Sequence, residues 1–327
     1  MNVLPDSKRR ALLEQHGRFP VAYSAAFQPD LRYFGDENGF LSYKMVGGTA
    51  FVLADPIAPA EHHGALIDDF LAKYQDVSFW QISHATAALL NGRGFFVNAF
   101  GSETVVDLRN FSFKGPARRS FRTAANRFEA SGHSVCEVPL SGEIGRKLRA
   151  VSEAWRRSKA TKSRELRFLV RPVVLGDEEG ARKFVLFNKQ GEPEGFAFFD
   201  PVYEGGHVVG YLSATRRWLP GTDPLAGYLL MRKAIETFQS EGAHELHLGL
   251  SPFHMIEDKE FNKNWVTRRG FRFFYTNAFT NRFLYPVRSL SQHKDIYGGE
   301  QRLVYVAFNR LPAVVRLLKL LRACRII

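Results

Sequence analysis

A small set of residues has the types and spacing that could support chemistry. Trp155 and Lys159 lie four positions apart, Glu165 and Phe168 follow, and Arg217 stands just before a break at residues 219–221. The familiar catalytic signatures are missing: the sequence has no H-E-x-x-H, no G-x-S-x-G, no Walker A motif and no dinucleotide-binding G-x-G-x-x-G after a strand. These observations exclude the zinc hydrolases, the α/β-hydrolases and the P-loop enzymes.

Histidine and cysteine do not form a pattern typical of a metal site. His62 and His63 are adjacent, and His244 and His247 are three apart without cysteine near them. Cys136 and Cys324 are the two cysteines of the chain, and they are far apart in the sequence. We therefore expect no metal, no disulfide and no bound cofactor.

Charge is the most informative bulk property. The 327 residues include 45 Lys plus Arg against 33 Asp plus Glu, which gives a formal net charge of +12. This excess favours a polyanionic partner, either nucleic acid, an anionic membrane surface or a phosphorylated substrate. A merely soluble basic surface is the alternative.

Two predicted helices could carry this charge to a partner. In the helix expected over residues 117–130, Arg118, Arg119 and Arg122 lie opposite an apolar stripe and could form a phosphate-binding ridge. The C-terminal helix expected over residues 311–327 is basic and amphipathic, which suits an anionic membrane interface. The alternatives are a solvated charged face for the first helix and packing on its own domain for the second.

Residues 208–253 predict a strand, a turn, a helix and a second strand. Apolar residues fill the strand at 208–212, recur with helical spacing from Leu225 to Phe238, and alternate again at 246–250. Such a unit connects two neighbouring parallel strands. The break before the helix would leave N–H groups unpaired, which suits the phosphates of a bulky donor.

The rest of the chain predicts an α/β (α+β) protein with two similar halves. Strands are expected at 39–45, 49–54, 78–82, 95–98, 104–108, 134–138, 183–188, 195–200, 261–265, 271–275 and 303–308, with helices between many of them. We place the domains at residues 1–140 and 141–310, each a mixed twisted sheet flanked by helices, followed by the C-terminal helix 311–327. No stretch is long and apolar enough to span a membrane and no signal peptide is seen, so we expect a cytoplasmic protein, with peripheral binding at the inner face of the membrane as a further option.

Five stretches in order resemble the catalytic domain of phosphatidylglycerol lysyltransferases: 34–59, 106–132, 154–169, 208–253 and 285–300. The resemblance implies two tandem GNAT-like domains with the active site between them. It also implies transfer of an amino acid from aminoacyl-tRNA, the co-substrate, to a lipid headgroup such as phosphatidylglycerol or to a small-molecule acceptor.

By the same resemblance, seven residues match motif positions that line or support the site, and an eighth, Tyr228, stands at a further site position where its residue type differs from the family's. The expected catalytic residues are Lys159, Glu165 and Arg217, and the expected substrate-binding residues are Trp155, Phe168, Tyr228, Ser251 and Lys294. An aminoacyl ester is already activated, so the enzyme must mainly position two substrates and stabilise an oxyanion. Lys159 or Arg217 could offset the developing charge, and Glu165 could bind the donor's ammonium group or act as a base. A structural ion pair is the alternative for each charged residue.

Two positions depart from the lysyl-transferring pattern. Ala214 and Tyr228 stand where those enzymes have acidic residues, so a lysyl side chain would lack partners and a small or neutral aminoacyl group is expected instead. Two other functions stay open. An acyl-CoA-dependent N-acyltransferase would use the Arg216–Gly221 loop, although this loop lacks the second glycine of that class, and a non-catalytic RNA- or membrane-binding module would need only the basic helices.

Overall fold

The structure is a computed structural model that describes residues 4–158, 165–261, 263–277, 287–310 and 313–325. The strands of this described part form a single mixed sheet in the order β1-β2-β3-β4-β11-β5-β10-β9-β8-β7-β6. Their bounds are β1 Arg32–Asp36, β2 Gly39–Val46, β3 Thr49–Ile57, β4 Val77–Ile82, β5 Phe96–Asp107, β6 Ser134–Glu137, β7 Arg182–Phe187, β8 Pro193–Glu204, β9 His207–Trp218, β10 Glu245–Pro252 and β11 Glu300–Phe308.

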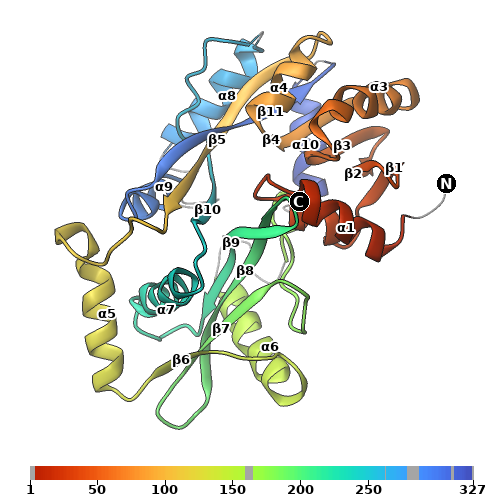
Figure 1. Ribbon diagram of the computed structural model, residues 1–327. Helices are drawn as coiled ribbons and strands as arrows, with labels where there is room; N and C mark the ends of the chain where they lie inside the picture. Colours follow the sequence, from red (N-terminus) through yellow and green to blue (C-terminus); the bar gives the residue numbers. More distant parts are fainter. Residues whose placement is uncertain (1–3, 159–164, 262, 278–286, 311–312, 326–327) are drawn as a thin grey trace.

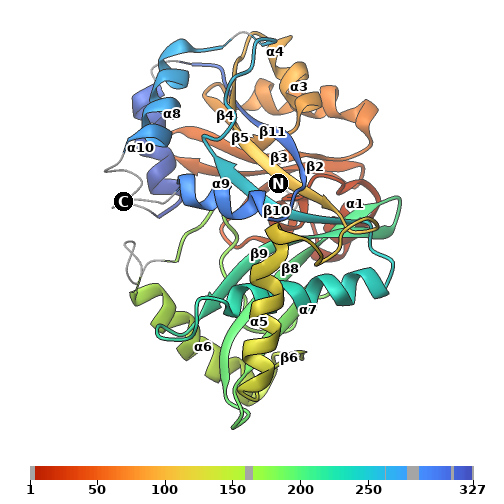
Figure 2. The ribbon, with the colours of Figure 1, turned by 90° about the vertical axis from the view of Figure 1, so that its left-hand side faces the viewer.

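Helices cover both faces of this sheet, which confirms the predicted fold class (Figure 1). Their bounds are α1 Asp6–His16, α2 Ala22–Phe27, α3 His63–Lys73, α4 His84–Asn91, α5 Arg119–Ala130, α6 Gly142–Arg157, α7 Ala226–Ser240, α8 Trp265–Thr276, α9 Val287–Asp295 and α10 Ala313–Ala323, with short 3-10 turns at Ala60–His62 and Pro116–Arg118. Figure 2 shows β6–β9 with α5–α7 in the lower half, and α3, α4, α8 and α10 in the upper half. In the described chain, no helix is both long and apolar enough to cross a bilayer.

The two halves share strands in a way that the sequence did not suggest. β11, near the end of the chain, lies between β4 and β5 and pairs antiparallel with both. β6, which precedes the predicted boundary at residue 140, pairs with β7 at the far edge of the second half. The division into two domains stays a prediction, because the sheet runs without interruption through both halves.

The central unit has the predicted form. β9 and β10 are parallel neighbours joined by α7, whose apolar positions Leu230, Ala234, Ile235 and Phe238 are all buried. Other predictions were wrong. The strands expected at 261–265 and 271–275 lie in or beside α8, which Asn264 caps by accepting a hydrogen bond from the Thr267 N–H at 2.9 Å. The two strands expected at 95–98 and 104–108 are one long strand, β5.

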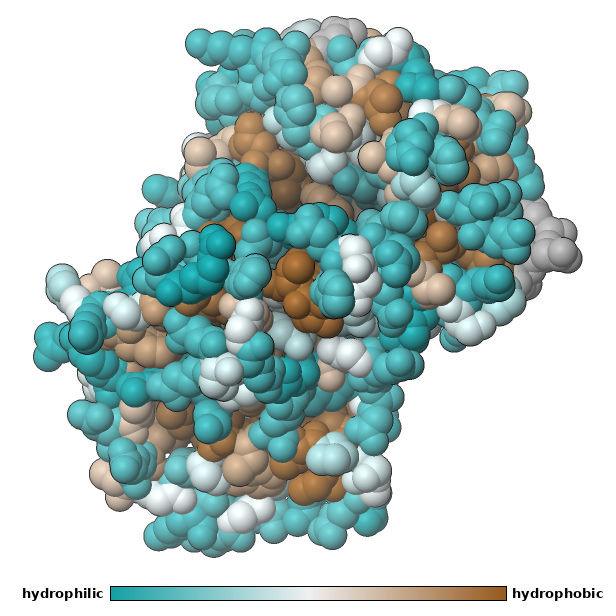
Figure 3. Space-filling model, in the orientation of Figure 1, coloured by the Kyte–Doolittle hydropathy of each residue, from teal (hydrophilic) through white to brown (hydrophobic). Residues whose placement is uncertain are grey.

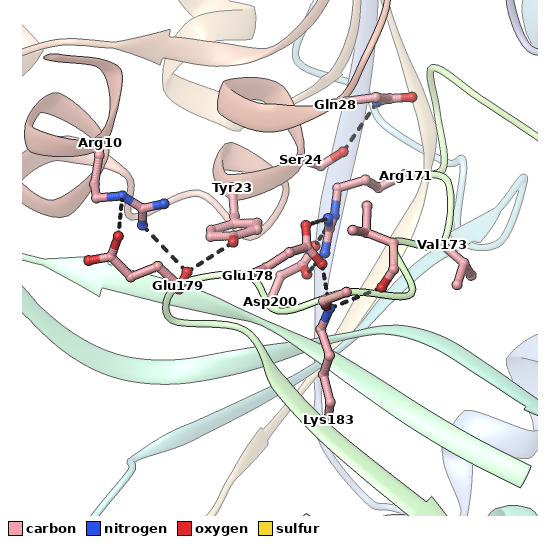
Figure 4. Close-up of polar contacts among 12 residues, drawn as sticks. Arg10, Tyr23, Ser24, Gln28, Arg171, Val173, Glu178, Glu179, Lys183 and Asp200 are labelled. Carbon is pink, nitrogen blue, oxygen red and sulfur yellow. Dashed lines mark hydrogen bonds and ion pairs between the residues drawn. The ribbon is translucent and has the colours of Figure 1, made fainter. Parts of the chain in front are cut away.

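A buried ion network fixes the segment that follows residue 164 (Figure 4). Arg171 binds both oxygens of the Asp200 carboxylate and one oxygen of Glu178, whose other oxygen accepts from Lys183 at 2.8 Å. Burial alone would lower the pKa of Arg171, but the carboxylates of Asp200 and Glu178 raise it. The network therefore ties the loop before β7 to the β7–β8 pair.

Candidate functional site

The ladder between β9 and β10 stops halfway along both strands. The parallel pairing joins residues 210–212 of β9 to residues 245–247 of β10 and ends there. β9 runs on to Trp218 with β8 on its other side, and β10 runs on to Pro252 paired with β5. Among the residues that the structure describes, one edge of 213–218 consequently has no partner strand, and backbone groups at such an edge can bind a substrate.

Lys294 binds β10 at the point where this strand separates from β9. Gly249 has φ +74°, and the register of β10 against β5 shifts between His247 and Leu250. The ammonium Nζ of Lys294, on α9, donates to the carbonyl oxygens of Gly249 at 2.6 Å and Leu250 at 2.9 Å. The lysine is thus the partner of two carbonyl groups that the bulge turns away from the ladder.

The environment of Lys294 favours its neutral form. Its side chain is buried, and burial lowers its pKa to about 7, with Glu103 opposing the shift and Arg216 adding to it. Two of its N–H groups are taken by the bulge carbonyls. The third position of the nitrogen carries a proton below the pKa and a lone pair above it, which is what a proton-transfer group requires.

Arg216, Tyr228 and His293 meet beside Lys294. The guanidinium Nη1 of Arg216 lies 3.4 Å from Nε2 of His293, and the Tyr228 hydroxyl lies 3.1 Å from Nδ1 of the same ring. Burial lowers the pKa of His293 to about 4, helped by the charges of Arg216 and Lys294. Among the described residues, no carboxylate pairs with Arg216, so this cluster carries net positive charge.

Arg217 faces the other side of the sheet and is held there by both of its terminal nitrogens. Its guanidinium donates to both oxygens of Glu165, at 2.5 and 3.1 Å, and to the Ser152 hydroxyl at 2.6 Å. It also lies over the Trp155 ring, 4.9 Å from the centroid. The structure therefore brings together three residues that the sequence singled out, Trp155, Glu165 and Arg217, in a largely buried cluster. Arg156 lies next to it, 3.5 Å from Glu165.

The loop before α7 does not offer the free N–H groups expected there. The Asp223 carboxylate accepts from the Leu225 N–H at 2.9 Å and also binds Arg127. The hydrogen bond from the Leu225 N–H and the ion pair both lower the pKa of Asp223. A groove of about 500 Å³ lies over this loop, but Asp223 and Glu194 line it. An acid of the chain itself thus occupies the place predicted for donor phosphates.

Ser251 of β10 and the buried acid Glu103 of β5 lie near Lys294. Ser251 is buried on β10 and its hydroxyl has no hydrogen-bond partner in the described structure. Next to it along β10, His247 lies between Glu103 at 3.4 Å and Glu245 at 3.2 Å. Burial would lower the pKa of His247, but these carboxylates raise it. No cluster of three or more potential metal-binding side chains occurs in the described ranges.

Several functional candidates were missed from the sequence. His293 was missed because it is a lone histidine, and Arg216 was considered only as part of the loop that an acyl-CoA-dependent enzyme would use. Glu103 was missed because the strand that contains it was predicted as two shorter ones. Period-2 alternation along β9 could have shown that consecutive arginines face opposite sides.

Phe168 and Lys159 were also expected at the site. Phe168 is buried with φ +69°, and the Gln28 side chain accepts from its N–H at 2.5 Å and donates to its carbonyl at 3.0 Å. Its ring packs against Phe51 in the core of the first half, so it supports the loop that carries Glu165. Lys159 lies outside the described residues, and its role stays a prediction.

The arginine ridge of α5 is only partly as predicted. Arg119 and Arg122 are exposed, but Arg122 donates to the carbonyl oxygens of Phe113 and Gly115. Arg118 turns inward and donates to the carbonyl oxygens of Ile296 and Tyr297. The prediction that all three face outward was wrong, because the turn before α5 orients Arg118 toward the end of α9.

The C-terminal helix packs on the sheet. Leu320 and Cys324 of this segment are buried in the core of the first half, and α10 contacts β2. Arg316, expected on the solvent face, is buried and binds Asp76 and the Val77 carbonyl oxygen. The helix therefore packs on the protein itself, as the alternative had it, although on the first half and not on the half that it follows in the chain.

Comparison with known proteins gives consistent matches over nearly the whole chain. The profile of the family "Phosphatidylglycerol lysyltransferase, C-terminal" matches residues 10–308. A phosphatidylglycerol lysyltransferase of Staphylococcus aureus (strain MRSA252) is 26% identical over 308 residues, which cover 91% of this chain and 35% of that protein. One from Staphylococcus haemolyticus (strain JCSC1435) is 23% identical over 319 residues, covering 93% and 36%.

The fold agrees with these matches. The solved structure of L-PGS from Bacillus licheniformis superposes with a TM-score of 0.80 at 22% identity, covering 99% of this chain and 97% of that one. The chain spans about a third of the length of the curated relatives that it matches.

Proposed function

Because the chain belongs to the phosphatidylglycerol lysyltransferase C-terminal family, we propose that it is an aminoacyltransferase. It moves an amino acid from aminoacyl-tRNA to a hydroxyl of a lipid headgroup of the phosphatidylglycerol kind, or to a small-molecule acceptor. The observation that carries this proposal is the family match together with the cationic cluster at the open edge of β9. Its place of action would be the cytoplasmic side of the membrane, with tRNA and the lipid surface as partners.

The reaction suits what the cluster can supply. The acceptor hydroxyl attacks the ester carbonyl carbon of the donor, a new C–O bond forms, and the bond to the tRNA ribose oxygen breaks. The acceptor proton passes to the neutral amine of Lys294 and from there to the departing ribose oxygen. Arg216, without a carboxylate partner among the described residues, offsets the negative charge on the tetrahedral intermediate.

The Glu165–Arg217 pair is better suited to positioning than to chemistry. Each partner already neutralises the other, and the Ser152 hydroxyl and the Trp155 ring occupy further sides of the guanidinium. We propose that this cluster fixes β9 against α6 and so sets the position of Arg216. Ser251, with its unpartnered buried hydroxyl, remains a substrate-binding candidate.

The charge around Tyr228 affects which aminoacyl side chain the site can accept. His293, Arg216 and Lys294 surround it with positive or neutral groups, and no carboxylate hydrogen-bonds to its hydroxyl among the residues described. A lysyl side chain would face the Arg216 guanidinium there without a compensating acid among the described residues. We propose a neutral aminoacyl group as the donor's side chain.

Transfer of label from tRNA to lipid tests the proposal. The purified protein is incubated with phosphatidylglycerol vesicles and a pool of radiolabelled aminoacyl-tRNAs, and the lipid phase is counted with and without prior RNase treatment. RNase-sensitive label in the lipid supports the proposal. If label appears neither in lipid nor in added small amines, or if acetyl-CoA serves equally well as donor, the proposal is wrong.

A further inference from the structure

α8 presents a stripe of large apolar side chains to solvent. The side chain of Trp265 is 63% exposed, that of Phe273 57% and that of Val266 46%. Trp265, Arg269 and Phe273 are spaced four apart and therefore share one face of the helix. Adjacent exposed apolar residues of this size typically mark an interaction surface.

The same helix is basic. Residues 265–276 include Arg268, Arg269 and Arg272 and no carboxylate. Arg269 lies 5.0 Å from the centre of the Trp265 ring, while Arg268 and Arg272 flank the stripe and share one carboxylate, that of Glu257. Three guanidinium groups around exposed Trp and Phe are complementary to an anionic surface that is apolar just beneath.

The exposed stripe does not hold the fold together. α8 packs through Thr267 and Phe271, which are buried, and the Phe271 ring lies 5.5 Å from that of Phe100. Asn264 caps the first turn. The helix is thus formed and anchored by its inner face, and the residues that the structure describes leave its outer face exposed.

α8 is connected to the candidate site by a short path. The Tyr275 hydroxyl lies 3.3 Å from that of Ser291 on α9, one turn before Lys294. The loop that joins β10 to α8 begins directly after Ser251 and Pro252. A surface held by α8 would therefore lie beside the end of β10 that the substrate must reach. Figures 1 and 2 place α8 on the outside of the upper half, and Figure 3 shows apolar atoms among hydrophilic ones in that region.

We propose that α8 docks this protein on an anionic bilayer surface. Trp265, Val266 and Phe273 enter the boundary between headgroups and acyl chains, while Arg269 remains at the level of the lipid phosphates. Val266 favours a bilayer over RNA, since an aliphatic side chain gains nothing from stacked bases but gains from an apolar interior. The inference goes beyond the proposed reaction, and it moves the membrane contact from the C-terminal helix, where the sequence suggested it, to α8.

Vesicle binding tests the proposal. The full chain is sedimented with vesicles of phosphatidylcholine alone and of equal parts phosphatidylcholine and phosphatidylglycerol, in the absence of tRNA. We expect binding to the anionic vesicles, and binding at least about tenfold weaker for the double variant Trp265→Ser/Phe273→Ser. Leu318→Ser, which removes an exposed leucine from α10 (53% exposed), is the matched control and should bind like the unaltered chain.

A second measurement guards against misfolding of the double variant. Quenching of tryptophan fluorescence by brominated phosphatidylglycerol should be strong in the unaltered chain and mostly lost in the conservative variant Trp265→Phe. The proposal is overturned if the unaltered chain binds no vesicle, if the double variant binds as well as the unaltered chain, or if it loses tRNA binding instead of vesicle binding. The assay includes no donor, so these outcomes are independent of whether aminoacyl transfer is observed.

Discussion

Arg216 and Arg217 are consecutive residues of β9 whose guanidinium groups lie on opposite faces of the sheet. Arg217 is buried against α6, where Glu165 binds it through both carboxylate oxygens. Arg216 lies beside His293 of α9 and has no carboxylate partner among the described residues. One arginine is thus held by the protein, and its neighbour is available to a ligand.

Replacing each arginine by alanine should separate these roles. Arg217→Ala leaves the largely buried Glu165 without its main partner and should lower the free energy of unfolding by about 3 kcal/mol. Arg216→Ala should change it by less than about 1 kcal/mol, yet reduce aminoacyl transfer about 100-fold, because it removes charge stabilisation from the intermediate. Urea unfolding and the label-transfer assay measure the two effects. Equal loss of stability in both variants would contradict this assignment.

Activity should depend on the protonation of Lys294. Its pKa of about 7 means that the neutral amine, the form that can accept the acceptor's proton, becomes scarce below neutrality. The single-turnover rate should then fall about tenfold per pH unit below about 7 and level off above it. Lys294→Gln should lose this dependence together with most of the activity. The range from about pH 5 to about pH 7 lies on the acid side of the Lys294 pKa. A rate of the unaltered chain that stays constant over this range would exclude Lys294 as the base.

The same lysine should make the free energy of unfolding depend on pH above neutrality. Its pKa is about 7 when folded and about 10.4 when unfolded. Between these values the unfolded chain binds more protons, so the free energy of unfolding should rise with pH relative to that of Lys294→Gln. The cost of burying the charge is fully present below about pH 7 and disappears toward pH 10. Urea titrations across this window measure it, with the exposed-surface variant Lys189→Gln as the control for loss of a charge.

The ion network below α1 and α2 should be a main determinant of stability. Asp200→Asn leaves Arg171 with one carboxylate in place of two, at a site where both residues are buried. We expect a loss of about 3–5 kcal/mol in urea unfolding. Glu236→Gln removes an ion pair with Arg232 on the outer face of α7 and should cost less than about 0.5 kcal/mol. If both variants lose a comparable free energy of unfolding, then burial is not what makes the Arg171–Asp200 ion pair important for stability.

Local patterns predicted the central unit well. The period-3.6 spacing from Leu225 to Phe238 identifies α7 because that helix has one face in the core, and the alternation of leucines around His247 identifies β10, although His247 is buried as well. α8 was predicted as strands because its aromatic run resembles a strand when burial is unknown. Its helical state depends on the Asn264 cap and on Phe271 packing against Phe100, and the second is a contact between distant segments.

The site could be predicted only in part. A motif match suffices to select Glu165, Arg217 and Lys294, but the separation of Arg216 from Arg217 depends on which helix covers each face of β9. The insertion of β11 between β4 and β5 depends on long-range pairing, which no local signal encodes. Arg118 was misassigned for the same reason: its partners, the carbonyl groups of Ile296 and Tyr297, are far away in the sequence.

Introducing acids beside Arg216 should change the choice of donor. Ala214 lies on β9 two residues before Arg216, and Tyr228 contacts the same histidine as Arg216 does. An added carboxylate there would pair with a lysyl ammonium group and would offset the positive charge that excludes it. We expect Ala214→Asp/Tyr228→Glu to raise transfer from lysyl-tRNA relative to alanyl-tRNA by about tenfold, or about 1.4 kcal/mol.

The matched isosteric variant Ala214→Asn/Tyr228→Gln separates charge from shape. It adds similar volume and removes the same phenol, but it provides no negative charge. Competition between lysyl- and alanyl-tRNA in one reaction measures the ratio directly and is insensitive to a general loss of activity. If the amide variant shifts the ratio as much as the acidic one, pocket shape decides the donor. If only the acidic variant does, the positive charge of Arg216 is what selects a neutral aminoacyl group.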